Sequence, residues 1–221
     1  MNKPVKIGDA TLYLADCMDV LPTLEGVQCV ITDPPYGIGK AEWDNIDFFP
    51  FISGLYNTLM SVTKSGAICF VWMPKKRLYE LSKLEFKFDI FIETKNFAQS
   101  FPHNLMIDCW VPIMMFSNGK RKTISAKNYF MINTANTSFD SPNNPRNIDH
   151  PTVKDVSIIS YFLLHSSAVA ETILDPFMGS GTTGVAALRL GRKFVGVEID
   201  KKYFQIACER IQREYDQMKL F

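Results

Sequence analysis

The sequence predicts an α/β fold in which one mostly parallel sheet is covered by helices on both faces. Short β-rich runs alternate with helical patterns along the chain. Several of these runs are continuously apolar, which is typical of strands buried on both faces. The length of 221 residues suits one domain with a large core, and 47% hydrophobic with 21% charged residues is an ordinary globular composition.

Each element has its own signal. Strands are expected, in chain order, at residues 11–15, 27–32, 67–72, 88–93, 110–116, 172–175 and 194–198. Helices are expected over 153–164, from Thr182 onward, and at the C-terminus, where an apolar stripe recurs with helical spacing at Phe204, Ala207, Cys208, Ile211 and Tyr215. Residues 117–150 lack periodicity and are rich in Asn, Ser, Pro, Lys and Arg, which predicts a small insert in a single domain over 1–221.

Composition also excludes several protein classes. No apolar stretch approaches the ~18 residues of a membrane span, and acidic residues precede any signal-like apolar run, so we expect a cytoplasmic protein. The five cysteines are widely spaced with no CxxC pair, which favours buried thiols over disulfides or zinc ligands. The three histidines, His103, His150 and His165, are too scattered for a metal site, so we expect no metal.

Charge is unevenly distributed, although the net charge is only +1. Residues 1–50 carry three basic and eight acidic side chains, whereas residues 118–150 carry five basic and two acidic ones. This second segment is the candidate surface for a polyanion, and a solvated basic loop is the alternative. Its basic residues are Lys120, Arg121, Lys122, Lys127 and Arg146.

The first motif is ILDPFMGSGTTGVAAL at 173–188. A strand ends at Asp175, a turn follows through Gly179 and Gly181, and Thr182 opens a helix. Glycines let a ligand approach the backbone closely, so the turn predicts a cofactor site. Glu198, at the end of the next strand, has the position of the acid that accepts two ribose hydroxyls in nucleoside-binding α/β folds. The alternative is that the glycines only permit tight packing.

The second motif is VQCVITDPPYGIG at 27–39, an apolar strand that ends in Asp33, Pro34, Pro35 and Tyr36. Each proline stiffens the residue before it and offers no amide hydrogen. The Asp33 carboxylate and the Pro34 carbonyl can accept both hydrogens of one amino group, and the Tyr36 ring offers a flat face to a base. We interpret the motif as a rigid acceptor for an amine.

Together these residues resemble the amino-methyltransferases of DNA, which join an Asp-Pro-Pro-Tyr motif to an FxGxG motif, here Phe177, Gly179 and Gly181. The catalytic motif comes first and HPTVK at 150–154 precedes the cofactor motif, as in the permuted β group. The resemblance implies a circularly permuted, Rossmann-like methyltransferase fold with seven mostly parallel strands and one antiparallel strand near 110–116. It also implies S-adenosylmethionine as cofactor, double-stranded DNA as partner, and transfer to the exocyclic amine of a flipped base.

Adenine N6 is the expected acceptor. Cytosine N4 and a non-catalytic DNA-binding subunit are the alternatives, and a glutamine-methylating relative is less expected because those resemble an Asn-Pro-Pro-Tyr pattern. Members of the family often dimerise, but no interface can be read from this sequence. The resemblance assigns catalysis to Asp33, Pro34, Pro35 and Tyr36, and cofactor binding to Asp16, His150, Thr152, Lys154, Asp175, Phe177, Gly179, Gly181, Thr182 and Glu198.

Two of these positions have a second interpretation. Only one helix follows Glu198, so residues 11–16 are expected to supply the missing neighbouring strand, with Asp16 near the cofactor adenine or acting as a helix cap. Asp155 stands where the family has proline after the HPTxK lysine. Thr152 and Asp155 have capping-box spacing, which predicts a helix from residue 153 and weakens the cofactor assignment of Lys154.

Overall fold

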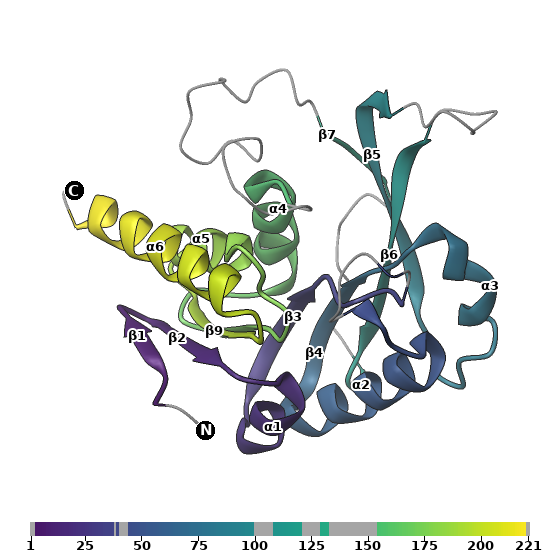
Figure 1. Ribbon diagram of the computed structural model, residues 1–221, viewed down its shortest axis with the longest axis horizontal. Coiled ribbons are helices and arrows are strands. Elements are labelled where there is room, and N and C mark those ends of the chain that lie inside the picture. Colours follow the sequence, from purple (N-terminus) through teal and green to yellow (C-terminus); the bar gives the residue numbers. More distant parts are fainter. Residues whose placement is uncertain are drawn as a thin grey trace.

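The computed structural model describes residues 3–37, 39, 44–99, 108–120, 129–132 and 154–219. These residues form one nine-stranded sheet, in the order β1-β2-β9-β8-β3-β4-β6-β5-β7, with helices beside it (Figure 1). The strands are β1 (Val5–Ile7), β2 (Ala10–Leu14), β3 (Val27–Thr32), β4 (Thr63–Trp72), β5 (Asp89–Gln99), β6 (Asp108–Ser117), β7 (Tyr129–Ile132), β8 (Thr172–Asp175) and β9 (Lys193–Glu198). The helices are α1 (Cys17–Val20), α2 (Phe48–Val62), α3 (Leu78–Leu81), α4 (Val156–Ser166), α5 (Thr182–Arg189) and α6 (Lys201–Met218), with short 3-10 turns η1 (Leu21–Thr23) and η3 (Lys75–Arg77).

The predicted fold class is confirmed, and all seven expected strands are present. The sheet has nine strands rather than seven because β1 and β7 extend its two edges. These strands have three and four residues, too few for an alternating pattern to be visible in the sequence. In the body of the sheet, β6 runs antiparallel to both β4 and β5, as the resemblance implied.

Alternate residues of the central strand β3 enter two different cores. Cys29 and Ile31 pack in a cluster with residues of α4, α5 and α6, whereas Val30 packs in a second cluster with residues of α1, α2 and α3. Figure 1 shows α4, α5 and α6 grouped on one side of the sheet. The continuous apolar run of β3 is therefore explained by burial on both faces.

Capping residues set where two helices begin. Asp200 is the N-cap of α6 and accepts hydrogen bonds from Lys202 N and Tyr203 N. Asp155 is the N-cap of α4 and accepts from Ser157 N at 2.7 Å. The predicted capping box was wrong on this point: Asp155 itself caps the helix, which begins at Val156 rather than at residue 153. Lys154 therefore precedes α4 instead of lying within it.

The permuted strand order is confirmed. β2 pairs in parallel with β9, and Leu14 lies opposite Glu198. β3 and β8 are also parallel neighbours, with β4 beyond β3 and β9 beyond β8. The boundary between β3 and β8 is therefore a switch point, from which the strand order continues in opposite directions. In open α/β sheets, ligands bind in the crevice outside the carboxyl ends of the strands at such a switch point.

Four of the five cysteine side chains are described, and these four are free thiols. Cys17, Cys29 and Cys69 are free and buried, and Cys208 is free and half-buried; the Cys109 side chain lies outside those described. Burial raises the pKa of the Cys29 thiol to about 12. Within the described ranges, no helix combines the length and the apolar character needed to cross a bilayer.

Candidate active site

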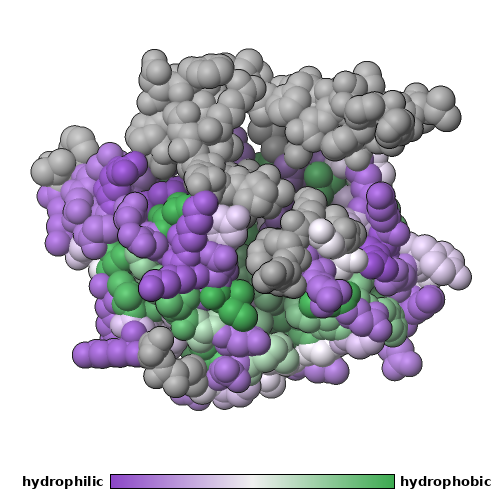
Figure 2. All heavy atoms as spheres, viewed as in Figure 1, coloured by the Kyte–Doolittle hydropathy of each residue, from purple (hydrophilic) through white to green (hydrophobic). Residues whose placement is uncertain are grey.

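One cavity of about 420 Å³ lies at the carboxyl ends of the central strands, where the β3–β8 switch point predicts a ligand site. It brings the two sequence motifs together, although they are far apart in the chain. In Figure 2, hydrophobic residues lie in the middle of the viewed face, between hydrophilic flanks. The residues that line the cavity include eleven of the predicted site residues: Asp16, Asp33, Pro34, Pro35, Tyr36, Lys154, Asp175, Phe177, Gly179, Thr182 and Glu198.

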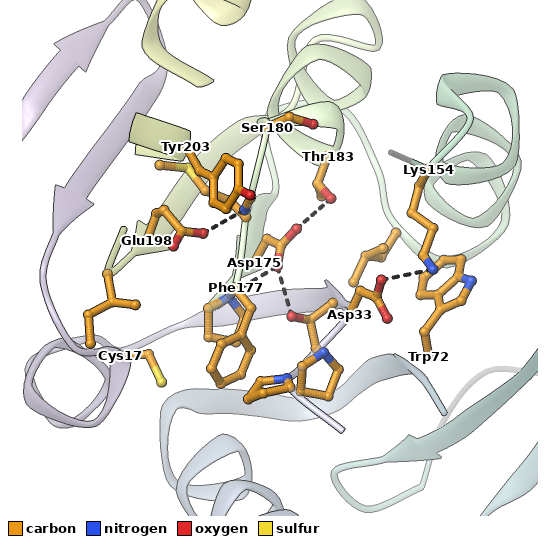
Figure 3. Close-up of a pocket in the computed structure, with 18 of the residues that line it drawn as sticks. Cys17, Asp33, Trp72, Lys154, Asp175, Phe177, Ser180, Thr183, Glu198 and Tyr203 are labelled. Carbon is orange, nitrogen blue, oxygen red and sulfur yellow. Dashed lines mark hydrogen bonds and ion pairs between the residues drawn. The ribbon is translucent and has the colours of Figure 1, made fainter. Parts of the chain in front are cut away.

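Asp175 joins the two motifs at the end of β8. Its carboxylate accepts hydrogen bonds from the Thr32 hydroxyl at 2.8 Å, the Thr183 hydroxyl at 2.6 Å and the Phe177 amide at 3.1 Å (Figure 3). Burial raises the pKa of Asp175 from 3.8 to about 7, against the opposing effect of these hydrogen bonds. The residue therefore acts as a buried cross-link between β3, β8 and α5.

Glu198 marks the other side of the cavity. Its two carboxylate oxygens accept from Gly179 N at 2.9 Å and from Asp200 N at 2.8 Å. Each oxygen keeps further acceptor capacity, so the carboxylate can still bind hydroxyl groups. Burial raises its pKa above the usual value. Next to it, Ile199 and Met18 line the cavity with side chains that remain 59% and 43% exposed, which offers apolar surface to a flat ligand.

The glycine turn is held from behind by α6. Gly181 has φ +80°, and a Cβ there would lie 2.9 Å from the Ala207 Cβ, so this glycine permits helix packing, as the alternative interpretation proposed. The buried Arg210 guanidinium donates to the Ser180 carbonyl at 2.6 Å and to the Thr182 hydroxyl at 3.1 Å. Burial lowers its pKa to about 10. This residue was not predicted, because Arg210 lies beside the apolar stripe of α6 rather than within it, where a charged side chain gives no signal of burial.

The Asp-Pro-Pro-Tyr motif lies on the opposite side of the cavity. Asp33 Oδ2 lies 2.8 Å from Lys154 Nζ, and Asp33 Oδ1 accepts a hydrogen bond from the Tyr36 hydroxyl. Burial and the neighbouring Asp33 carboxylate raise the pKa of Tyr36 well above its usual value. The turn after the prolines is fixed by Asp44, whose carboxylate accepts from Tyr36 N at 2.6 Å and from Gly37 N at 2.8 Å. Asp44 was not predicted from the sequence.

The remaining predicted residues are placed as follows. Asp16 lines the cavity and caps α1 by accepting from Met18 N at 2.9 Å. Lys120 lies beside Gly66, at the amino end of β4 and so at the edge of the sheet opposite the cavity. Six predicted residues lie outside the described part of the chain: Arg121, Lys122, Lys127, Arg146, His150 and Thr152. Among the residues that are described, no three His, Cys, Asp or Glu side chains form a group that could hold a metal ion.

Comparison of the sequence with known proteins finds similarity to methyltransferases. A family model described as DNA methylase matches residues 27–209. The Type II methyltransferase M2.DpnII of Streptococcus pneumoniae is 48% identical over 65 residues, which cover 29% of this chain and 24% of that protein. The Type II methyltransferase M.HpaI of Haemophilus parainfluenzae is 25% identical over 246 aligned positions, covering 94% of this chain and 76% of that protein.

Solved structures share the fold at low sequence identity. The PvuII DNA methyltransferase (cytosine-N4-specific) superposes with a TM-score of 0.76 at 17% identity, covering 98% of this chain and 95% of that one. The structure of the M1.HpyAVI–SAM complex superposes with a TM-score of 0.66 at 24% identity, covering 91% and 99%.

Proposed function

The chain belongs to the DNA methylase family, whose model spans most of it, and on this premise we propose that it transfers a methyl group from S-adenosylmethionine to the exocyclic amino group of a base in DNA. One observation carries the proposal. A single cavity is lined both by the rigid acceptor motif at Asp33 and by the glycine turn with Glu198. Methyl transfer requires the donor and the acceptor to be held at contact distance, and this arrangement supplies both sites.

The glycine-turn side of the cavity fits the cofactor. Glu198 would accept hydrogen bonds from the ribose hydroxyls, and Ile199 and Met18 would offer apolar surface to the adenine ring. Asp16 lies on the same flank and is the proposed acceptor for the adenine amino group. Bound S-adenosylmethionine supplies an electrophilic methyl group.

The motif at the end of β3 fits the acceptor amine. The lone pair of an exocyclic amine is delocalised into the base, so the amine is a poor nucleophile. Hydrogen bonds from its two hydrogens to the Asp33 carboxylate and the Pro34 carbonyl favour a pyramidal nitrogen whose lone pair faces the methyl group. Asp33 also stabilises the positive charge that develops on the nitrogen. Because this amine is stacked and paired in a duplex, the base must be flipped into the cavity.

Adenine N6 is the proposed acceptor, on the basis of the Asp-Pro-Pro-Tyr resemblance. Cytosine N4 is the second candidate, since the structural neighbour with a TM-score of 0.76 carries the name cytosine-N4-specific. Both bases present the same pair of N–H donors to Asp33 and Pro34, so the acceptor motif fits either. The identity of the methylated nucleoside distinguishes the two candidates.

The test is transfer of a labelled methyl group from S-adenosylmethionine to unmethylated DNA, followed by nucleoside analysis of the product. Asp33→Ala should lose at least ~3 kcal/mol of transition-state stabilisation, which is more than a hundredfold in rate, while cofactor binding persists. Glu198→Ala is the matched variant: it should weaken S-adenosylmethionine about tenfold or more, as expected when a charged hydrogen bond is removed. Near wild-type turnover in Asp33→Ala would contradict the mechanism.

A further inference from the structure

The ammonium group of Lys154 contacts the catalytic carboxylate, on the side of the cavity opposite the glycine turn (Figure 3). We infer that Lys154 is a positioning residue for Asp33 and not a cofactor ligand, an inference that rests on the proposed function. Its role is to hold one carboxylate oxygen in place, so that the other oxygen can accept a hydrogen bond from the target amine.

The geometry around Lys154 is well defined. Its Nζ lies 2.8 Å from Asp33 Oδ2 and 5.3 Å from the centroid of the Trp72 ring. The side chains of Lys154 and Asp33 are only 20% and 21% exposed, so water screens this ion pair less than a surface pair. Trp72 is itself fixed, because its Nε1 donates to the buried Glu93 carboxylate at 2.6 Å. The cation is thus confined between a fixed ring and the catalytic carboxylate.

The backbone also favours this position for Lys154. Asp155 caps α4 with its side chain, so the helix begins only at Val156 and Lys154 precedes it. From there the lysine side chain reaches the end of β3. This local structure follows from the Asp155 that replaces the proline of the related motif.

The two oxygens of Asp33 then have different roles. Lys154 holds Oδ2, whereas the Tyr36 hydroxyl donates to Oδ1. That hydroxyl occupies the acceptor position which an N–H of the target amine needs. The Tyr36 amide is bound by Asp44, so the ring can leave Oδ1 by side-chain rotation while the backbone stays in place. Base entry therefore exchanges the Tyr36 hydroxyl for the amine and retains Lys154.

Three further acidic side chains lie near the loop of Asp33 and Tyr36. Asp175 lies at the end of β8, Glu93 is on β5 and Asp44 precedes α2, and all three are buried. Tyr36, which is on the same loop as Asp33, is neutral. The Lys154 cation pairs with Asp33 among these acidic groups and fixes its Oδ2. Removal of the cation should therefore release the Asp33 carboxylate from this orientation.

Three variants test the inference: Lys154→Met, Lys154→Arg, and the control Lys64→Met, which changes an exposed lysine at the amino end of β4. Calorimetric titration measures S-adenosylmethionine affinity, and methyl incorporation into unmethylated DNA measures kcat and KM. We expect Lys154→Met to lower kcat at least tenfold, while cofactor affinity stays within twofold of wild type. Lys154→Arg should restore most of kcat, because arginine also pairs with a carboxylate.

Other outcomes overturn the inference. A tenfold loss of cofactor affinity in Lys154→Met with kcat retained would make Lys154 a cofactor ligand. An unchanged kcat in Lys154→Met would leave the lysine without a role in catalysis. Thermal melting identifies misfolded variants, for which Lys154→Gln replaces Lys154→Met with the same expectation. A wild-type protein that binds the cofactor but methylates no DNA would instead contradict the proposed function.

Discussion

The Thr32 hydroxyl donates to the Asp175 carboxylate over 2.8 Å, although 143 positions separate the two residues in the chain. Thr32 immediately precedes Asp33, and Asp175 immediately precedes the glycine turn. The same carboxylate binds Thr183 at the start of α5. The acceptor side and the cofactor side of the cavity are therefore joined through one buried group, and a disturbance there should affect both.

Asp175 should make the stability of the unliganded protein depend on pH. Its pKa of about 7 in the folded chain lies above the ordinary 3.8, so the folded state binds the proton more tightly. Stability from this group is fully present below pH 3.8 and is lost as the pH rises to about 7. The difference between the two pKa values corresponds to at most about 4 kcal/mol of free energy of unfolding. Denaturant unfolding of wild type and Asp175→Asn from pH 4 to 8 tests this prediction. The free energy of unfolding of the variant should increase relative to that of wild type as the pH rises. A difference that stays constant with pH would contradict the prediction.

Arg210 should support cofactor binding through the turn that it contacts. Arg210→Met removes the donors to the Ser180 carbonyl and the Thr182 hydroxyl, and we expect S-adenosylmethionine affinity to fall about tenfold, since hydrogen bonds to charged groups contribute roughly 1.5 to 3 kcal/mol. Arg189→Met is the control: it breaks an ion pair with Glu214 that also joins α5 to α6 but does not touch the turn. Calorimetric titration measures the S-adenosylmethionine affinity of both variants. Equal losses of affinity in the two variants would indicate general loosening of α6 instead.

Tyr36 should act through its ring. Tyr36→Ala should raise KM for DNA and lower kcat because stacking on a base contributes ~1 to 3 kcal/mol, whereas Tyr36→Phe and Tyr36→Trp keep a stacking face. Loss of the hydroxyl also frees Asp33 Oδ1 in the unliganded protein, which should not harm catalysis. Steady-state methylation assays compare the three variants. If Tyr36→Phe were as impaired as Tyr36→Ala, the hydroxyl would be the functional group.

Substitutions that remove positive charge can show at which end of strand β4 the protein binds DNA. Lys75 and Lys76 follow the carboxyl end of β4, close in the chain to the cavity residue Trp72. Lys120 lies at the amino end of the same strand, beside Gly66. At a rise of ~3.3 Å per strand residue, Gly66 and Trp72 are ~20 Å apart. We expect the double variant Lys75→Gln/Lys76→Gln to weaken DNA binding for all sequences. The slope of log affinity against log salt should flatten by up to ~0.9 for each lysine–phosphate ion pair that the substitutions remove.

Lys120→Gln is the matched comparison for that variant. Anisotropy titrations at several salt concentrations should show little change for it, and cofactor affinity should be unchanged in both proteins. A flatter slope in Lys120→Gln alone would assign DNA binding to the end of β4 at which Lys120 lies, in agreement with the prediction from the basic residues of 117–150.

The fold class, the positions of seven strands and the two motifs could be predicted from the amino-acid sequence alone. These features are local: the apolar run of β3 reflects burial on two faces, and the Asp33 and Gly179 motifs each directly follow a strand. The permuted pairing of β2 with β9 was also predictable, because a parallel methyltransferase sheet needs a strand beside Glu198 and residues 11–16 supply one.

Which side chains meet at the cavity could not be predicted from the sequence and follows from the folded arrangement of the strands and helices. The ion pair of Lys154 with Asp33, the contacts of Asp175 with Thr32 and of Arg210 with Ser180, and the position of Lys120 at the far edge all join or separate residues that lie far apart in the chain. Spacing in the sequence contains no signal for such contacts. They depend on which strands become neighbours, on the edge at which each strand ends, and on how far a lysine or arginine side chain reaches from its backbone position.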